Sequence, residues 1–211
     1  MPDYSPTTLV RGKALSDRVG VAEVLVKDES SRMGLPSFKI LGASWAAYKA
    51  LEGHVGTLEP WQDVGELSAR LQPHLPLTLA AATDGNHGRA VARMARLLGL
   101  GARIFVPEGT AHARIEGIES EGAECSVVEG TYEDAVERSA REAGERCLVI
   151  SDTSWPGYEE TPRRVIEGYS TIFWEIEEEL VARGAAPPDL VLIQAGVGAL
   201  AAAAARHFRR P

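Results

Sequence analysis

The chain has 211 residues, of which 45% are apolar and 25% are charged, and it carries a formal net charge of -8. These proportions are typical of a globular protein and exclude a largely disordered chain. The acidic balance argues against nucleic acid or an anionic membrane surface as the main partner, because both are bound through basic patches. We therefore expect a small-molecule ligand, with no nucleic acid and no membrane as partner.

The N-terminal sequence and the cysteines indicate the cellular compartment. Residues 1–15 contain no apolar core flanked by positive charge, and no stretch of the chain approaches the length of a membrane span. The two cysteines, Cys125 and Cys147, lie in apolar, strand-like segments and lack the spacing of a metal site. We expect a cytoplasmic protein that binds no metal.

Short β-type segments alternate with helical segments from about residue 21 onward. The predicted strands are residues 21–27, 77–83, 102–107, 123–129, 146–150 and 189–195. The predicted helices are residues 38–52, 86–99, 111–122, 131–144, 162–184 and 199–210, with weaker helical character at 63–71. Strands that are apolar throughout and separated by helices indicate parallel sheets with helices on both faces. The fold class is therefore α/β.

Two glycine-rich turns follow predicted strands, where ligands bind in open α/β sheets. The turn TDGNHG, residues 83–88, places flexible backbone and free N–H groups at a helix start, where an anion such as a carboxylate can bind. The alternative is that Asp84 or Asn86 only caps the helix. The turn GVG, residues 196–198, fits a phosphate cradle, although any tight strand-to-helix turn can use glycine.

Lys39 stands at the start of an apolar helix, directly before the small residues of the GA pair at 42–43. A lysine is almost never fully buried without a partner. The chain has only four lysines and otherwise uses arginine, which suggests a need for an amine that can lose its proton and react. The alternative is a side chain that extends past its neighbours to water.

The motifs SFK with GA, then TDGNHG, then a glycine-rich turn after a buried strand, resemble the fold type II family of pyridoxal-phosphate enzymes. This is the tryptophan synthase β-like group, which contains the serine and threonine dehydratases. The resemblance covers about residues 24–201 and implies that Lys39 bonds covalently to pyridoxal 5'-phosphate. It also implies a cofactor contact from Asn86, a phosphate loop of Gly196, Val197 and Gly198, and a substrate loop that includes Thr83, Asp84, Gly85 and His87, with the His87 ring expected to be structural.

Within this family, TDGNHG together with SDTSWPGYEETP at 151–162 is similar to diaminopropionate ammonia-lyase. Dehydratases usually carry a serine where this chain has Asp84. The resemblance implies α,β-elimination of 2,3-diaminopropionate to pyruvate and ammonia, with Lys39 as the base for the L-isomer. Asp84 is then expected beside the β-ammonium group and as base for the D-isomer. Asp152 is the second candidate, unless it only caps its loop. A serine/threonine dehydratase-like lyase is the alternative reaction.

Members of the family are considerably longer than 211 residues, so the chain looks like the N-terminal part of such an enzyme, with a C-terminally incomplete fold. We expect residues 41–159 to form a small α/β domain, and residues 1–40 and 160–211 to form part of a large cofactor domain. A homodimer, or association with a missing C-terminal portion, is the expected assembly. A truncated, non-catalytic remnant of the family is the alternative to an enzyme.

Overall fold

The computed structural model describes residues 1–209 and contains a four-stranded parallel sheet. Its strands are β3 (Thr78–Ala82), β4 (Gly101–Pro107), β5 (Glu124–Val128) and β6 (Cys147–Val149), in the order β5-β4-β3-β6. Ala80 of the central strand β3 pairs in register with Arg103 on one side and Val149 on the other. The predicted parallel α/β fold is confirmed over this part of the chain.

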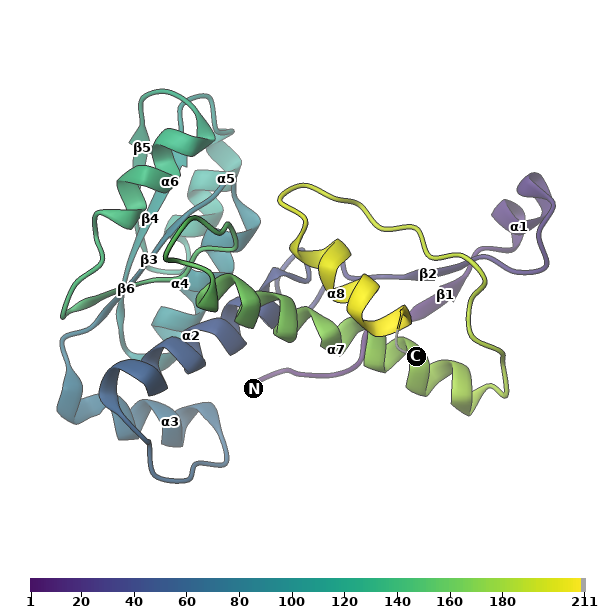
Figure 1. Ribbon diagram of the computed structural model, residues 1–211, viewed down its shortest axis with the longest axis horizontal. Coiled ribbons are helices and arrows are strands. Elements are labelled where there is room, and N and C mark those ends of the chain that lie inside the picture. The colour runs from purple at the N-terminus through teal and green to yellow at the C-terminus, as the bar shows by residue number, and fades with distance from the viewer. Residues whose placement is uncertain (210–211) are drawn as a thin grey trace.

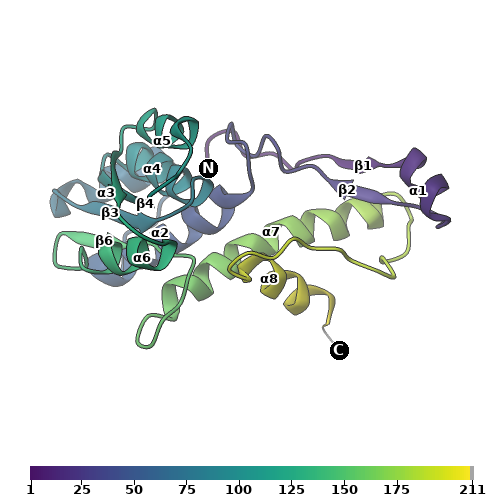
Figure 2. The same cartoon turned by 90° about the horizontal axis from the view of Figure 1, so that it is seen from above.

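Helices cover both faces of the sheet, because alternate residues of each strand point to opposite faces. Leu79 and Ile104 face the main core, which also contains α4 (Asn86–Leu98) and the end of α5 (His112–Glu119). Ala80 and Phe105 face the other way, where the Arg138 side chain of α6 (Tyr132–Ala140) covers the Phe105 ring. Figures 1 and 2 show α4 and α6 on opposite sides of the strands.

The helix ends follow the predicted signals. Gly99 ends α4 in a left-handed conformation with a φ of +71°. The Thr131 side chain caps α6 and forms a reciprocal capping box with Asp134. The weak helical segment is α3 (Val64–Leu71), capped by Asp63 and followed by the short helix η1 (Gln72–His74).

Two long helices connect the sheet to the rest of the molecule. The helix α2 (Lys39–Val55) packs against α7 (Glu160–Ala182), which runs from beside the sheet toward the opposite end of the molecule (Figure 1). Glycines sit where they cross: a Cβ on Gly168 would collide with the carbonyl group of Leu41, and a Cβ on Gly42 would collide with Tyr169. This close approach fixes the first turn of α2, and therefore the position of Lys39, against α7.

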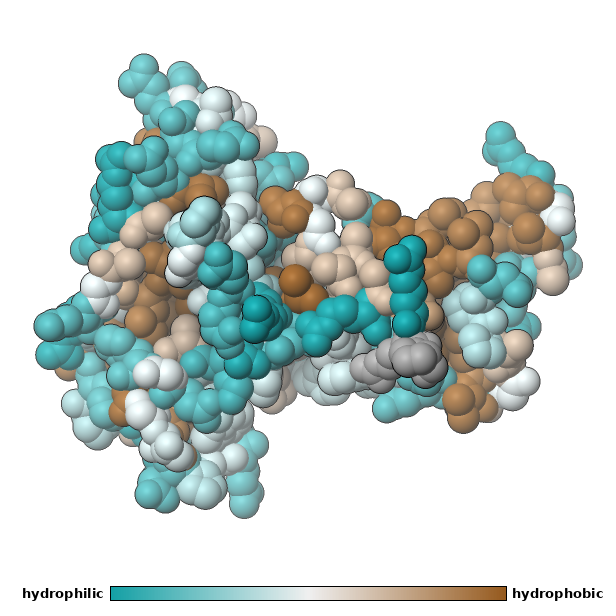
Figure 3. Space-filling view, viewed as in Figure 1, coloured by the Kyte–Doolittle hydropathy of each residue, from teal (hydrophilic) through white to brown (hydrophobic). Residues whose placement is uncertain are grey.

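The first 27 residues form an arm that was only partly predicted. Instead of a strand at 21–27 that starts the parallel series, the short β2 (Leu25–Lys27) pairs antiparallel with β1 (Leu9–Arg11), and α1 (Lys13–Val19) joins the two. The arm extends beside the far end of α7, away from the sheet (Figures 1 and 2). Figure 3 shows many hydrophobic residues on the face of the molecule at this end. Of the predicted strand at 21–27, only residues 25–27 form a strand, and the segment that pairs with it has no comparable sequence signal.

The predicted strand at 189–195 is wrong for this structure. The segment belongs to none of the strands in residues 1–209, and its Leu190 and Leu192 side chains are 74% and 84% exposed. An apolar segment becomes a strand only when a neighbouring strand satisfies its backbone groups, and none lies beside it here. The predicted helix that follows is confirmed as α8 (Ala199–Phe208), which packs along α7; residue 210 of the predicted helix lies outside the described residues. The division into domains at residues 41 and 160 stays a prediction.

None of the helices in residues 1–209 has the length and apolar character needed to cross a bilayer.

Candidate functional site

The amine of Lys39 has a carboxylate partner. Lys39 is the first residue of α2, and its Nζ donates a hydrogen bond of 2.6 Å to Oδ2 of Asp152, in the loop after β6. The rings of Phe38 and Tyr169 lie 5.8 and 5.9 Å from the same nitrogen. The Lys39 side chain is 21% exposed, whereas Asp152 is 4% exposed. Buried Asp152 therefore holds the amine in place, and the Lys39 side chain that carries it is partly exposed to solvent.

Asp152 is ionised in this environment. Burial by itself would raise the pKa of its carboxyl group. The positive charges that His87 and Lys39 can carry, together with the hydrogen bond from Lys39, outweigh burial and lower the pKa. The reading of Asp152 as a simple loop cap does not account for this pairing with a lysine that is distant in sequence.

His87 is the third member of the cluster and is almost completely buried. Its Nε2 lies 2.7 Å from the carbonyl oxygen of Ile150, and its Nδ1 lies 3.9 Å from Oδ2 of Asp152. Burial is the main reason that the pKa of His87 is lowered. The expected structural role of His87 fits the bond to Ile150, whereas Nδ1 has no hydrogen-bond partner among the described residues.

The buried side chain of Thr83 stabilises the turn between β3 and α4. Its buried hydroxyl accepts hydrogen bonds from the backbone N–H groups of Gly85 and Gly88, at 2.9 and 3.0 Å. Gly88 has no room for a side chain, because a Cβ would collide with Thr83, and Gly85 has a φ of +147° that favours glycine. The N-cap of α4 is Gly85, without a side-chain cap. The capping alternative for Asp84 and Asn86 is therefore not what the structure shows.

Asp84 and Asn86 point outward from this turn. Both residues are exposed, and the Asp84 side chain is 75% exposed. Arg114 of α5 lies over the turn: its guanidinium donates to the carbonyl oxygen of Asp84 at 2.7 Å and lies 3.5 Å from the Asp84 carboxylate. Asp84 lies three residues before His87 on the same turn, and its charge, like that of Lys39, influences the pKa of His87.

The second glycine turn lies at the start of α8. Gly198 precedes the helix with a φ of +91°, and nothing lies within 4 Å of the Cβ position of either Gly196 or Gly198. Val197 is exposed. No hydrogen bond or ion pair within residues 1–209 links this turn to Lys39. The structure thus brings together Lys39, Asp152 and the turn at 83–88, and leaves the turn at 196–198 as an open backbone loop beside α7.

Sequence reasoning did not identify two tyrosines beside this cluster. Tyr169 of α7 is fully buried, and its hydroxyl has no hydrogen-bond partner among the described residues. Tyr132 of α6 contacts Thr153 through its hydroxyl at 3.3 Å, and burial raises its pKa to about 12. Both stand at positions where helical periodicity predicts only core packing, so the sequence offers no local signal for them.

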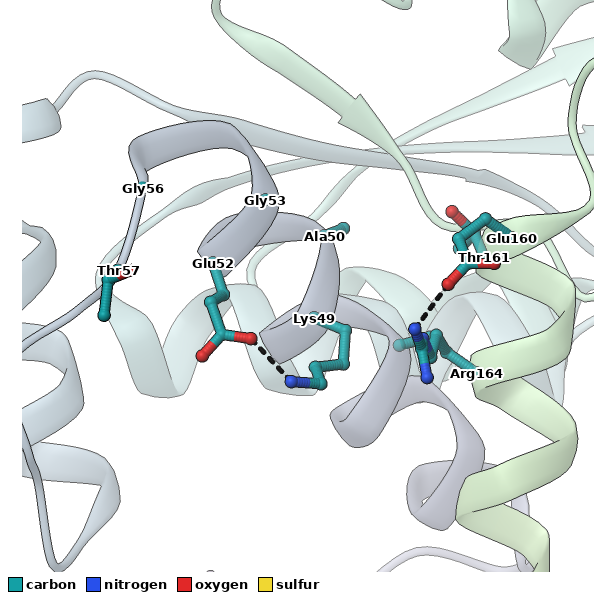
Figure 4. Close-up of a pocket in the computed structure, with 10 residues that line it drawn as sticks. Lys49, Ala50, Glu52, Gly53, Gly56, Thr57, Glu160, Thr161 and Arg164 are labelled. Atoms are coloured by element: carbon teal, nitrogen blue, oxygen red, sulfur yellow. Dashed lines mark hydrogen bonds and ion pairs between the residues drawn. The ribbon is translucent and has the colours of Figure 1, made fainter.

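A separate cavity of about 500 Å³ lies between α2 and the start of α7 (Figure 4). Its charged residues pair with one another: Lys49 with Glu52 at 2.6 Å, and Arg164 with Glu160 at 2.5 Å. It contains none of the predicted site residues. The functional cluster is therefore at the Lys39 end of α2, and this cavity near the other end is not part of it.

Comparison with known proteins identifies the class of protein that has this fold and cluster. Residues 1–210 match the model of the pyridoxal-phosphate dependent enzyme family, and the chain belongs to that family. It is 37% identical over 216 residues to diaminopropionate ammonia-lyase of Salmonella typhimurium, covering 99% of this chain and 52% of that relative. L-serine dehydratase/L-threonine deaminase of Rattus norvegicus is more distant, at 28% identity over 217 residues, 92% of this chain and 54% of that protein.

Solved structures agree with the sequence relatives. Escherichia coli diaminopropionate ammonia lyase in its apo form is similar with a TM-score of 0.90 and 36% identity, over 99% of this chain and 56% of that one. The same enzyme in complex with an aminoacrylate-PLP azomethine reaction intermediate has a TM-score of 0.85 and 35% identity, over 99% of this chain and 52% of that one. The chain spans about half the length of the curated relatives it matches.

Proposed function

We propose that this chain supplies the lysine and the substrate loop of a pyridoxal-phosphate-dependent ammonia-lyase that acts on 2,3-diaminopropionate. The observation that carries the proposal is the amine of the partly exposed Lys39 side chain, held by buried Asp152 next to the turn at 83–88. The charge of a purely structural lysine is accommodated either by a buried carboxylate or by contact with solvent. The Lys39 side chain has both. Similarity to diaminopropionate ammonia-lyases supports this choice of substrate.

The residues present fit the cofactor. A primary amine can bond to the aldehyde of pyridoxal phosphate, and Asn86, which is exposed on the turn that also carries His87, would supply an amide contact to the cofactor. Gly196 and Gly198 leave open space where side chains would stand, which suits a phosphate cradled by backbone N–H groups at the start of α8. When bound, the cofactor supplies an electron sink that weakens the Cα–H bond of an amino-acid substrate.

The protein groups have distinct tasks in this proposal. Lys39, once its amine is free and neutral, removes the Cα proton of the L-isomer. In this proposal the exposed carboxylate of Asp84 attracts the β-ammonium group of the substrate and acts as the base for the D-isomer. The free N–H groups at the start of α4 favour the substrate carboxylate, with Thr83 and Gly85 holding the turn in shape. Asp152 positions Lys39.

A serine/threonine dehydratase-like activity is the second candidate. It is supported by the more distant relatives, and it differs in the leaving group, which is a hydroxyl instead of an ammonium. The carboxylate at position 84 favours diaminopropionate over serine as the substrate. Its negative charge attracts the cationic β-ammonium group, whereas the β-hydroxyl group of serine carries no charge.

The activity of the whole enzyme depends on assembly. Since the relatives are about twice as long, we propose that turnover requires a homodimer or the portion equivalent to their second half. We expect weak cofactor capture and little turnover by the 211-residue chain alone. A remnant without catalysis remains the competing function if no cofactor is captured. A cytoplasmic location is part of the proposal.

Absorbance spectroscopy with added pyridoxal phosphate tests the proposal. The chain should develop the band of a lysine-bound cofactor, and Lys39→Ala should abolish it. Lys49→Ala is the matched control, because Lys49 is on the same helix and forms an ion pair with Glu52 at 2.6 Å. An equal band in the Lys39→Ala chain would refute the proposal. Pyruvate formation from diaminopropionate, rather than from serine, then separates the two candidate reactions.

A further inference from the structure

The loop after β6 carries Asp152 between two residues that hold each other. The hydroxyl of Ser151 donates a hydrogen bond to the carbonyl oxygen of Thr153 at 3.1 Å and accepts one from the Thr153 N–H group, also at 3.1 Å. Ser151 is fully buried, and Asp152 is nearly so. The turn at 151–153 is therefore closed around Asp152, and the position of this turn sets where the Asp152 carboxylate meets Lys39.

Tyr158 attaches this turn to the end of the sheet. Its hydroxyl donates to the carbonyl oxygen of Val149 at 2.5 Å and accepts from the N–H group of Ser151 at 3.1 Å. Burial is the main cause that raises the pKa of Tyr158, so the hydroxyl keeps its proton at neutral pH and remains a donor. Val149 is the last residue of β6 and pairs in register with Ala80 of the central strand. One hydroxyl thus links the sheet to the turn that carries Asp152.

The Tyr158 side chain is itself held in place by a tight turn. Trp155 and Tyr158 exchange backbone hydrogen bonds of 2.8 and 3.4 Å, and their rings stack with centroids 4.0 Å apart. Pro156 and Gly157 occupy the centre of the turn, and the φ of Gly157 is +86°, as at the third position of a type II turn. Both rings pack against the smaller apolar cluster of the sheet, on the face that α6 covers. The position of the hydroxyl is therefore fixed by contacts that do not involve Lys39.

We propose that Tyr158 is a positioning residue, which holds the Asp152 carboxylate against the Lys39 amine. It acts through the turn at 151–153. Without the Tyr158 hydroxyl, a carbonyl group and an N–H group of this loop lose their partners, and the turn moves to satisfy them elsewhere. Such a movement lengthens the 2.6 Å hydrogen bond between Lys39 Nζ and Oδ2 of Asp152. The inference rests on the proposed function, because it concerns the amine that would bond to the cofactor.

Carbon NMR of the Asp152 carboxyl group tests the proposal in the cofactor-free chain, with Asp152→Asn to assign the signal. Tyr158→Phe keeps the ring and removes the hydroxyl. If the contact with Lys39 is weakened while Asp152 stays buried, the pKa of Asp152 should rise by about one unit. The titratable groups whose charges interact with Asp152 are Lys39 of α2, His87 of α4, Tyr132 of α6, Tyr158 of the loop and Tyr169 of α7.

Two controls separate positioning from a general loss of structure. Tyr48→Phe removes a hydroxyl that bonds to Glu52 at 2.8 Å on α2, and it should leave the pKa of Asp152 at the wild-type value. In a Lys39→Met chain, Tyr158→Phe should shift the pKa of Asp152 much less than in the wild-type chain, because the contact that Tyr158 maintains is already absent. A merely structural role would give the same shift in both chains.

An unchanged pKa of Asp152 in Tyr158→Phe, or an equal shift with and without Lys39, would overturn the proposal. If Tyr158→Phe does not fold, Ser151→Ala decides, because Tyr158 reaches Asp152 through Ser151. Ser151→Ala opens the turn at 151–153 and should raise the pKa of Asp152 in the same way, and an unchanged value would refute the positioning role. These measurements need neither cofactor nor turnover. Failure of the positioning role would leave cofactor attachment at Lys39 standing, and failure of attachment would leave the positioning role testable.

Discussion

Arg114 holds the backbone of Asp84 and leaves the Asp84 carboxylate exposed. Its guanidinium bonds the carbonyl oxygen of Asp84 at 2.7 Å, while the carboxylate, 3.5 Å away, is 75% exposed. The methylene groups of Arg114 lie against the Cα of Gly85, where a Cβ would be 3.0 Å from Arg114 Cδ. A glycine at 85 thus lets α5 cover the turn, and the turn presents Asp84 toward solvent, where a substrate would arrive.

Asp84→Ser should separate cofactor binding from substrate binding. The absorbance band of the lysine-bound cofactor should remain, because Lys39 and not Asp84 makes the covalent bond. The concentration of diaminopropionate needed to perturb that band should rise by roughly tenfold, as expected when about 1.4 kcal/mol of charge attraction is lost. Serine, which has no β-ammonium group, is the matched ligand and should bind the variant as it binds the wild-type chain. An unchanged response to diaminopropionate would remove Asp84 from the substrate site.

The crossing of α2 and α7 should tolerate no side chain at position 168. Gly168→Ala would place a methyl group against the Leu41 carbonyl, so we expect the free energy of unfolding to fall by about 1–3 kcal/mol. Gly53→Ala on α2 is the matched control: its Cβ would meet nothing within 4 Å, and alanine favours the helix by ~1 kcal/mol. Urea denaturation of both variants measures the difference. Equal stability of the two variants would show that the close crossing is not formed.

The stability of the chain should decrease in acid. Three nearly buried carboxylates, Glu121, Asp152 and Glu175, have lowered pKa values, because neighbouring cations outweigh the effect of burial. The stability that these carboxylates contribute is fully present when the pH is above their pKa values in the unfolded chain, 4.5 for glutamate and 3.8 for aspartate. The contribution is lost as the pH falls through the lower folded-state values. We expect the midpoint of urea unfolding to decline between roughly pH 5 and pH 3.

Glu175→Gln tests the largest part of that acid effect. Glu175 accepts hydrogen bonds from buried Arg32 at 2.7 and 2.8 Å and pairs with Lys27 at 2.7 Å, tying the N-terminal arm to α7. The variant should be less stable at neutral pH, and its stability should depend less steeply on pH in the acid range. Glu177→Gln on the same helix is the control, since the Glu177 side chain is 63% exposed. A steeper acid dependence in Glu175→Gln would contradict the assignment.

Local sequence signals were sufficient for the sheet and its helices, and insufficient for interactions across the chain. The alternation from β3 to α6 was predictable because each strand and helix carries its own apolar pattern and end signals, such as Thr131 and Gly99. The bond from Lys39 to Asp152 spans 113 residues, so no local pattern could have revealed it. The segment 189–195 has the pattern of a strand, but strand formation also requires a neighbour, which the sequence of the segment does not contain.

Cofactor attachment at Lys39 is tested most directly by chemical trapping. The chain is incubated with pyridoxal phosphate, reduced with borohydride to make any lysine adduct permanent, digested, and mapped by mass spectrometry. The chain has four lysines, Lys13, Lys27, Lys39 and Lys49, so each can be scored separately. We expect the cofactor mass on the peptide that contains Lys39, at a concentration of pyridoxal phosphate that leaves Lys13 and Lys49 unmodified. Equal labelling of the exposed lysines, or no label on Lys39, would contradict its assignment as the cofactor lysine.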